Sequence, residues 1–148
     1  MSQKKNTDNR AEMIIRFDQV QATHEGLPVF RPLDQISGSV QIIPKRDLNK
    51  ARDTTLELRW YTTGRGDTDA GVIESRVLHQ GAISQSMTLS DSFRFTLPQE
   101  PWSFSGHYIN INWAIRVLID LPMASDISLT ENFLMLPGDG SSAGESAW

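Results

Sequence analysis

Histidine exchanges protons readily near neutral pH, so the three histidines of this chain are its first candidates for catalysis. They are His24, His79 and His107, and no two of them are spaced as His-x-His or His-x-x-x-His. The chain has no cysteine, which excludes thiolate metal ligands, cysteine nucleophiles and disulfide bonds. A zinc site would need histidines from separate segments to converge in space. We therefore predict no metal site and no cofactor.

A serine nucleophile requires a histidine base and an acidic residue that orients the base. The chain contains no G-x-S-x-G elbow, no Walker A loop and no dinucleotide-binding fingerprint. Ser37, Gly38 and Ser39 follow one another, but they lie in a strand-like pattern, where small residues allow close packing. We therefore predict no catalytic residues and expect that the chain is not an enzyme.

The segment Gly64–Gly71 is polar and rich in glycine and aspartate, and it is the most distinctive loop of the chain. Its Asp-Thr-Asp alternation is similar to the start of a calcium-binding loop, but the later ligands and the distal glutamate of an EF-hand are missing. Loops on rigid β-scaffolds often carry recognition. Arg65, Asp67 and Asp69 are therefore our candidate binding residues.

The elements on either side of this loop have the two-residue period of β-strands. Before the loop, Leu56, Leu58 and Trp60 alternate with polar residues. The clearest run is 107–119, in which every odd position is His, Ile, Trp or Val. We predict that its central Trp113 lies in the core. Further alternating runs lie at 13–17, 36–42, 93–97 and 129–135.

The segment Ala70–His79 is a less regular strand, because Val72 and Leu78 lie on the opposite parity from Ile73 and Val77. A β-bulge or an environment that is apolar on both faces would each explain this pattern. No stretch of ten residues shows a convincing helical stripe. Strands without intervening helices are typical of a β-sandwich.

The 148 residues suit one domain, with 39% hydrophobic residues and a net charge of −4. No basic face is evident, so we expect no nucleic-acid partner. No apolar run approaches the roughly 20 residues of a membrane span, and the first residues lack an apolar signal segment. Together with the absence of cysteine, this favours a cytoplasmic location.

Composition also suggests the limits of the domain. Residues 1–11 are polar and are predicted to be a disordered tail. Residues 138–148 are rich in glycine and serine, end in Trp148, and are predicted to be a flexible C-terminal tail. The predicted β-sandwich domain therefore spans 12–137.

Three segments together resemble the arrestin-like family. They are FRPLDQISGSVQII at 30–43, LELRWYTTGRGDTD at 56–69, and the run from Phe93 to Pro122, in which Phe-x-Phe-x-Leu-Pro is followed by a proline–glycine crossover and a long strand. The resemblance implies an all-β, immunoglobulin-like antiparallel β-sandwich of the arrestin type. The chain has room for one such sandwich, whereas arrestins have two. It is most similar to an arrestin N-type domain, as in short bacterial arrestin-like proteins of the sporulation-control type.

The resemblance implies a non-enzymatic protein-binding or scaffolding module with a protein partner. A homodimer is possible, because the face that a second sandwich covers in two-domain arrestins would be free. Tyr61, Tyr108 and Leu118, on outward parities, are candidate exposed apolar positions. The alternative is a small-ligand or carbohydrate-binding domain, in which Trp102 and Phe104 of the crossover stack on a sugar. The same two rings would otherwise plug the end of the sandwich.

Overall fold

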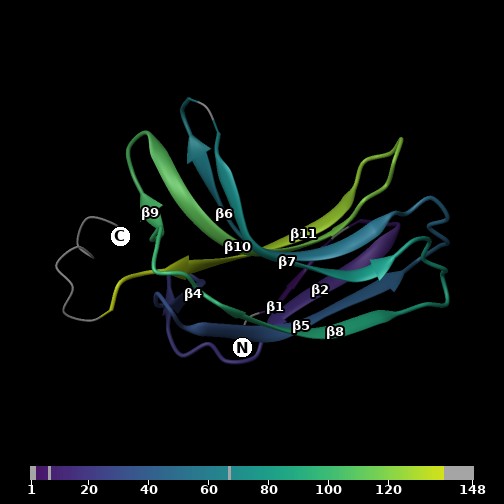
Figure 1. Ribbon diagram of the computed structural model, residues 1–148, viewed down its shortest axis with the longest axis horizontal. Coiled ribbons are helices and arrows are strands. Elements are labelled where there is room, and N and C mark those ends of the chain that lie inside the picture. Colours follow the sequence, from purple (N-terminus) through teal and green to yellow (C-terminus); the bar gives the residue numbers. More distant parts are fainter. Residues whose placement is uncertain (1–2, 7, 67, 139–148) are drawn as a thin grey trace.

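The chain folds into two packed β-sheets, shown in Figure 1. The computed structural model describes residues 3–6, 8–66 and 68–138, and these residues form no helix. Within them there is accordingly no helix long and apolar enough to span a membrane. The first sheet contains, in order, β1 (Gln3–Lys5), β2 (Ala11–Phe17), β5 (Gln35–Pro44) and β8 (Leu89–Thr96).

The second sheet is larger and has the order β3-β4-β11-β10-β6-β7, with the short β9 (Phe104–Ser105) also paired to β10. Its other strands are β3 (Thr23–His24), β4 (Leu27–Phe30), β6 (Asp53–Gly64), β7 (Ala70–Gln80), β10 (Ile109–Ile119) and β11 (Ile127–Met135). Neighbouring strands run antiparallel except β4 and β11, which are parallel. The predicted all-β sandwich is confirmed.

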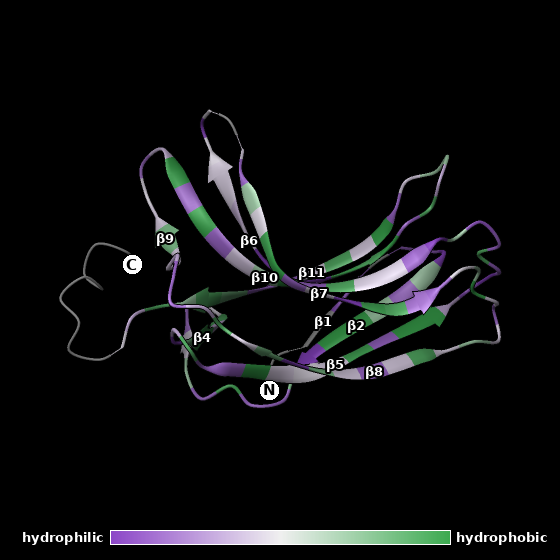
Figure 2. Cartoon of the chain, in the orientation of Figure 1, coloured by the Kyte–Doolittle hydropathy of each residue, from purple (hydrophilic) through white to green (hydrophobic). Residues whose placement is uncertain are grey.

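The alternation in the sequence determines which side chains form the core. Trp113 and the odd-numbered residues that follow it on β10 are fully buried, as predicted. Figure 2 shows the corresponding bands of hydrophobic and hydrophilic residues along this strand. Across the sandwich, the Phe17 ring of β2 lies edge-on to Phe133 of β11, with ring centres 6.1 Å apart. Burial of these large rings contributes to the stability of the sandwich.

Gly38 marks the closest approach of β5 to its neighbours. A Cβ at this position would lie 2.0 Å from the carbonyl oxygen of Arg16 and 2.7 Å from Cζ of Phe93. Only glycine fits there without a shift of the β2 backbone. This confirms that the Ser37–Ser39 segment provides close packing.

The N-terminal segment differs from its predicted disorder. Gln3–Lys5 forms β1 and pairs antiparallel with β2, in the register Lys5 opposite Ile14. The Asn6 side chain accepts a hydrogen bond from the Met13 N–H at 2.6 Å and donates one to the Ala11 carbonyl at 3.1 Å. The polar composition of this segment predicted a tail, because strand pairing at a sheet edge depends on backbone hydrogen bonds and not on apolar side chains. Residues 139–148, most of the predicted C-terminal tail, lie outside the described residues.

β7 has register shifts against β6, between Thr54 and Thr55 and between Leu58 and Arg59. The second shift leaves Ile73 as an extra residue between the pairs Leu58–Glu74 and Arg59–Val72. Such a bulge reverses the parity of the strand beyond it. The structure therefore supports the bulge explanation for the mixed pattern of Ala70–His79.

The buried position of Trp113 leads to a stability prediction. Its indole fills the core, and its Nε1–H donates a 2.7 Å hydrogen bond to the Pro101 carbonyl. Trp113→Ala should lower the free energy of unfolding by about 3–5 kcal/mol, because it leaves a large cavity. Urea unfolding followed by circular dichroism measures this change. A variant as stable as the wild type would contradict the assignment of the core face.

Candidate functional site

Sheet two extends beyond sheet one at one end of the molecule, where β6, β7, β9 and β10 rise together away from sheet one (Figure 1). We call this part, residues 60–66, 68–71 and 104–112, the arm. Side-chain burial decreases along the inner face of β10 toward the start of the strand. Trp113 is fully buried, Ile111 is partly buried, and Ile109 is 40% exposed. The arm therefore presents apolar side chains that no strand of sheet one covers.

At the tip of the arm, the β6–β7 loop contacts the turn that precedes β10. The Arg65 N–H donates a 2.8 Å hydrogen bond to the Tyr108 carbonyl. The Arg65 guanidinium carbon lies 5.4 Å from the centre of the Tyr108 ring, a cation–π geometry. A Cβ on Gly64 would lie 2.2 Å from the Tyr108 carbonyl oxygen, and Gly64 has a φ of +126°, so glycine is required here. Tyr108 itself is 59% exposed.

The predicted binding residues of this loop have different environments. Arg65 is exposed and packs on Tyr108. The Asp69 N–H donates to Thr62 Oγ1 at 2.8 Å, and the Asp69 carboxylate accepts the Ala70 N–H at 2.8 Å. Asp69 is thus occupied in shaping the turn. Asp67 lies outside the described residues. Of the three candidates, Arg65 is exposed with its guanidinium against an exposed aromatic ring.

Below the tip, the inner face of the arm forms one wall of an open groove of about 620 Å³. Trp60 and Ile111 come from the arm, and Glu100, Pro101 and Trp102 come from the crossover between β8 and β9. The Glu100–Pro101 peptide bond is cis. The Trp102 Nε1–H donates to the Gln99 carbonyl at 3.1 Å, which fixes the orientation of this indole. Two partly exposed indoles therefore line the groove beside one carboxylate.

Of the two aromatic residues proposed as sugar platforms, the structure places only Trp102 in the groove. Phe104 is partly buried on β9 and lies against Gly106, where a Cβ would be 2.3 Å from the Phe104 ring. The sequence did not indicate Trp60 or Glu100 as site residues. Trp60 has the parity of a core residue, and only the end of the opposing sheet leaves it partly exposed.

Tyr61, one of the three candidate exposed positions, lies in a polar network on the outer face of sheet two. Asn132 donates to the Tyr61 hydroxyl at 2.7 Å, and the Arg59 guanidinium carbon lies 5.2 Å from the ring centre. Burial, with the nearby Arg116 charge, lowers the pKa of Arg59 from its ordinary value. Tyr61 and Leu118 are half-buried. Of the three candidates, Tyr108 alone is exposed.

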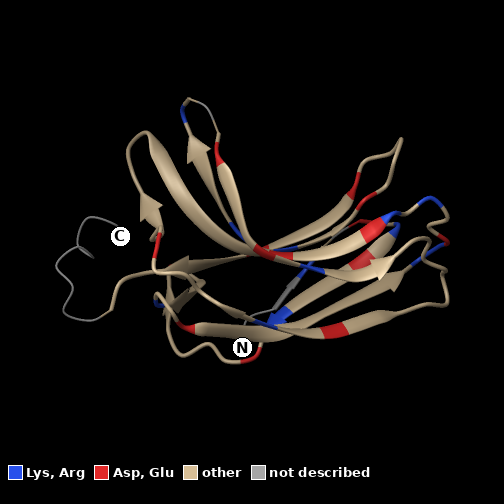
Figure 3. Ribbon diagram, viewed as in Figure 1, with Lys and Arg blue, Asp and Glu red and all other residues tan. Residues whose placement is uncertain are grey.

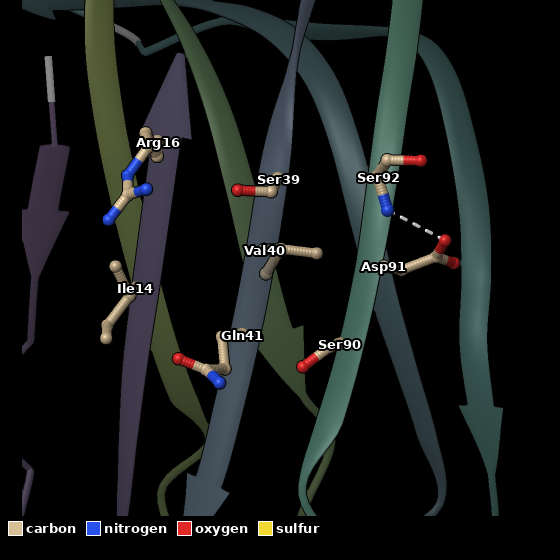
Figure 4. A pocket seen from close by; sticks show the side chains of 8 residues that line it. All are labelled: Ile14, Arg16, Ser39, Val40, Gln41, Ser90, Asp91 and Ser92. Atoms are coloured by element: carbon tan, nitrogen blue, oxygen red, sulfur yellow. Dashed lines mark hydrogen bonds between the residues drawn. The ribbon is translucent and has the colours of Figure 1, made fainter. Parts of the chain in front are cut away.

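A second hollow, of about 430 Å³, lies on the outer face of sheet one (Figure 4). Ser39, Ser90 and Ser92 line it with Gln41, Arg16 and three other side chains, and none of the lining residues is a histidine. Within the described ranges, no three His, Asp or Glu side chains are arranged to hold a metal ion. Figure 3 shows that acidic and basic residues mix at the end of the sandwich opposite the arm.

Together the two sheets form an immunoglobulin-like β-sandwich, and its fold is of the arrestin type, as the resemblance implied. The solved structure of Spo0M, a sporulation control protein from Bacillus subtilis, matches it with a TM-score of 0.58 at 16% sequence identity. The match covers 85% of this chain and 49% of that protein, so this chain spans about half the length of Spo0M. No family model and no curated protein sequence matches the chain.

Gly71 is the residue that allows the Trp60 indole to lie flat against β7. A Cβ there would lie 2.4 Å from Nε1 and 2.7 Å from Cε2 of Trp60. Gly71→Ala should therefore displace the indole and lower the free energy of unfolding by about 1–3 kcal/mol. The exposed Ser75→Ala on the same strand is the matched control, with an expected change within about 0.5 kcal/mol. Urea unfolding of both variants tests this, and equal stability would contradict the described position of Trp60.

Proposed function

We propose that this chain is a non-enzymatic protein-binding module that holds its partner with the arm. The observation that supports this most directly is the tip, where the Arg65 guanidinium lies over the exposed Tyr108 ring beside the exposed Ile109. Tyrosine and arginine are enriched among the residues that dominate binding energy at protein interfaces. Both lie in turns next to β6 and β10, and the 2.8 Å hydrogen bond from the Arg65 N–H to the Tyr108 carbonyl joins the two turns, which lowers the conformational entropy lost when a partner binds.

The groove below the tip is the second part of the proposed interface, and its chemistry indicates what it takes. Its walls offer two indole faces and an aliphatic side chain, and Glu100 is their one ionisable group. Indole faces and a carboxylate both attract a cation, and the aliphatic wall suits a hydrocarbon stem. The proposed occupant is therefore a lysine or arginine side chain of the partner protein.

Two further observations favour binding over catalysis. The described histidines lie apart, with His79 bonded to the Ala82 carbonyl on β7 and His107 against the Tyr108 ring at the tip. Spo0M, whose structure has the same fold, is named a sporulation control protein. A control role is compatible with a module that acts by binding.

A second candidate is a carbohydrate-binding domain, and the partly exposed Trp102 beside Glu100 is the observation that favours it. An indole face can stack on a sugar ring while the carboxylate accepts hydrogen bonds from its hydroxyls. The groove of about 620 Å³ is of the size found for small-ligand sites.

The first experiment identifies the partner and then tests the tip. The purified full chain captures proteins from its native cells, mass spectrometry identifies them, and calorimetry measures the Kd of a purified partner. Tyr108→Ala should weaken binding roughly thirtyfold, which corresponds to about 2 kcal/mol. Gln41→Ala, an exposed position on the other sheet, should leave the Kd unchanged. An unchanged Kd for Tyr108→Ala would exclude the tip as the contact.

The second experiment distinguishes the two candidate occupants of the groove. If a basic side chain binds there, Glu100→Gln should weaken partner binding and reduce its dependence on salt, because one screened charge pair is lost. A neutral oligosaccharide would bind with little dependence on salt, and Trp102→Ala would abolish that binding. Oligosaccharide binding to the wild type with no effect of Trp102→Ala would exclude the groove for sugars.

A further inference from the structure

We propose that β7 pairs with β7 of a second copy of this chain, antiparallel and with a two-fold axis at Ser75, so that Glu74 of each copy faces Arg76 of the other. This interface is separate from the arm tip and does not depend on the proposed function. It would join the larger sheets of two sandwiches into one continuous sheet.

The first observation is that β7 is an open edge of sheet two. It is the last strand in the sheet order, and β6 is its only pairing partner among the described strands. Open edges expose unpaired N–H and C=O groups and invite another strand. The residues of β7 include neither proline nor lysine, two common means of blocking an edge, and its β-bulges, another such means, lie outside the regular segment from Glu74 to Val77.

The second observation is the apolar surface of this strand. Seven large hydrophobic side chains of the described residues are exposed, and three of them are on β7: Val72 at 50%, Ile73 at 42% and Val77 at 52%. An edge strand that only faces solvent has no physical need for three such residues. Pairing with a second strand would cover part of this surface.

The third observation, the sequence of β7, selects both the occupant and the register. With the axis at Ser75, Glu74 lies opposite Arg76 of the second copy, and Ile73, at the edge of the regular segment, lies beside Val77. Opposite charges and apolar residues are thus matched on both sides of the axis. An axis at Glu74 would place two glutamates face to face, and an axis at Arg76 would place two arginines face to face. The strand is therefore complementary to itself in one register, as a two-fold interface requires.

The local structure around Ser75 suits this pairing. From Glu74 to Val77 the strand pairs with β6 without interruption, and the register shifts lie outside this segment. Glu74 is exposed. Arg76 bonds Asp91 of β8 through Nη2 at 2.7 Å, and a guanidinium has five N–H donors. The Arg76 guanidinium can therefore donate hydrogen bonds to Asp91 of its own copy and to Glu74 of the second copy at the same time.

Charge exchange tests the proposed register. In analytical ultracentrifugation of the full chain, the wild type should form a concentration-dependent dimer. Glu74→Arg alone and Arg76→Glu alone should each weaken it at least tenfold, because like charges then face each other. The double variant should restore the dimer, and an equimolar mixture of the two single variants should form a mixed dimer. Asp91→Asn, which removes the contact within one copy, should leave the dimer intact.

A cysteine variant tests the two-fold axis independently of charge. The chain has no cysteine. Directly opposed antiparallel residues have Cα atoms about 4.5–5.5 Å apart, within the range that a disulfide spans. With copper–phenanthroline as oxidant, Ser75→Cys should give a disulfide-linked dimer at least tenfold faster than the exposed control Ser86→Cys. A monomeric wild type, a double variant that fails to dimerise, or equal cross-linking rates would each overturn the proposal.

Discussion

The contact between the Trp113 indole and the Pro101 carbonyl connects the core of the sandwich to the candidate site. The indole lies among the phenyl rings that join the two sheets, with its centre 6.0 Å from that of Phe133. Its N–H has no access to water and is satisfied by the crossover segment at 2.7 Å. A buried N–H without an acceptor would lower the stability of the folded state. The crossover segment must therefore pass the end of the core where the Pro101 carbonyl can accept this hydrogen bond.

The same path determines where Trp102 lies. Immediately after it, the buried Ser103 donates its N–H to the Met135 carbonyl and accepts the Met135 N–H at its hydroxyl oxygen, both at 2.8 Å. The crossover is thus fixed on both sides of Trp102, by β10 through Pro101 and by β11 through Ser103. The groove wall is preformed because the core holds it, and a ligand would not have to order it.

Much of the fold follows from residue alternation, and most of the candidate site does not. The face of β10 and the burial of Trp113 were predictable because one strand determines its own parity. The exposure of Trp60 was not, because it depends on where the opposite sheet ends. The pairing of β1 depends on backbone bonds of a polar segment, and the parallel pair β4–β11 joins segments about 100 residues apart. The carboxylate of Asp69, a candidate binding residue, accepts the next backbone N–H, a local contact that residue type alone does not reveal.

The unequal length of the two sheets has a consequence for how the molecule opens. Backbone hydrogen bonds of β10 from Trp113 to Ile119 break only when the core is lost, because their side chains are fully buried on one face. The pairing of Ile109 with Gly64 has no such cover, so it can open in local fluctuations that leave the sandwich intact. Amide hydrogens of the arm would therefore exchange with solvent through a low-energy opening, and those of the inner strands only through global unfolding. The proposed binding surface and the stable core thus belong to the same strands but to different cooperative units.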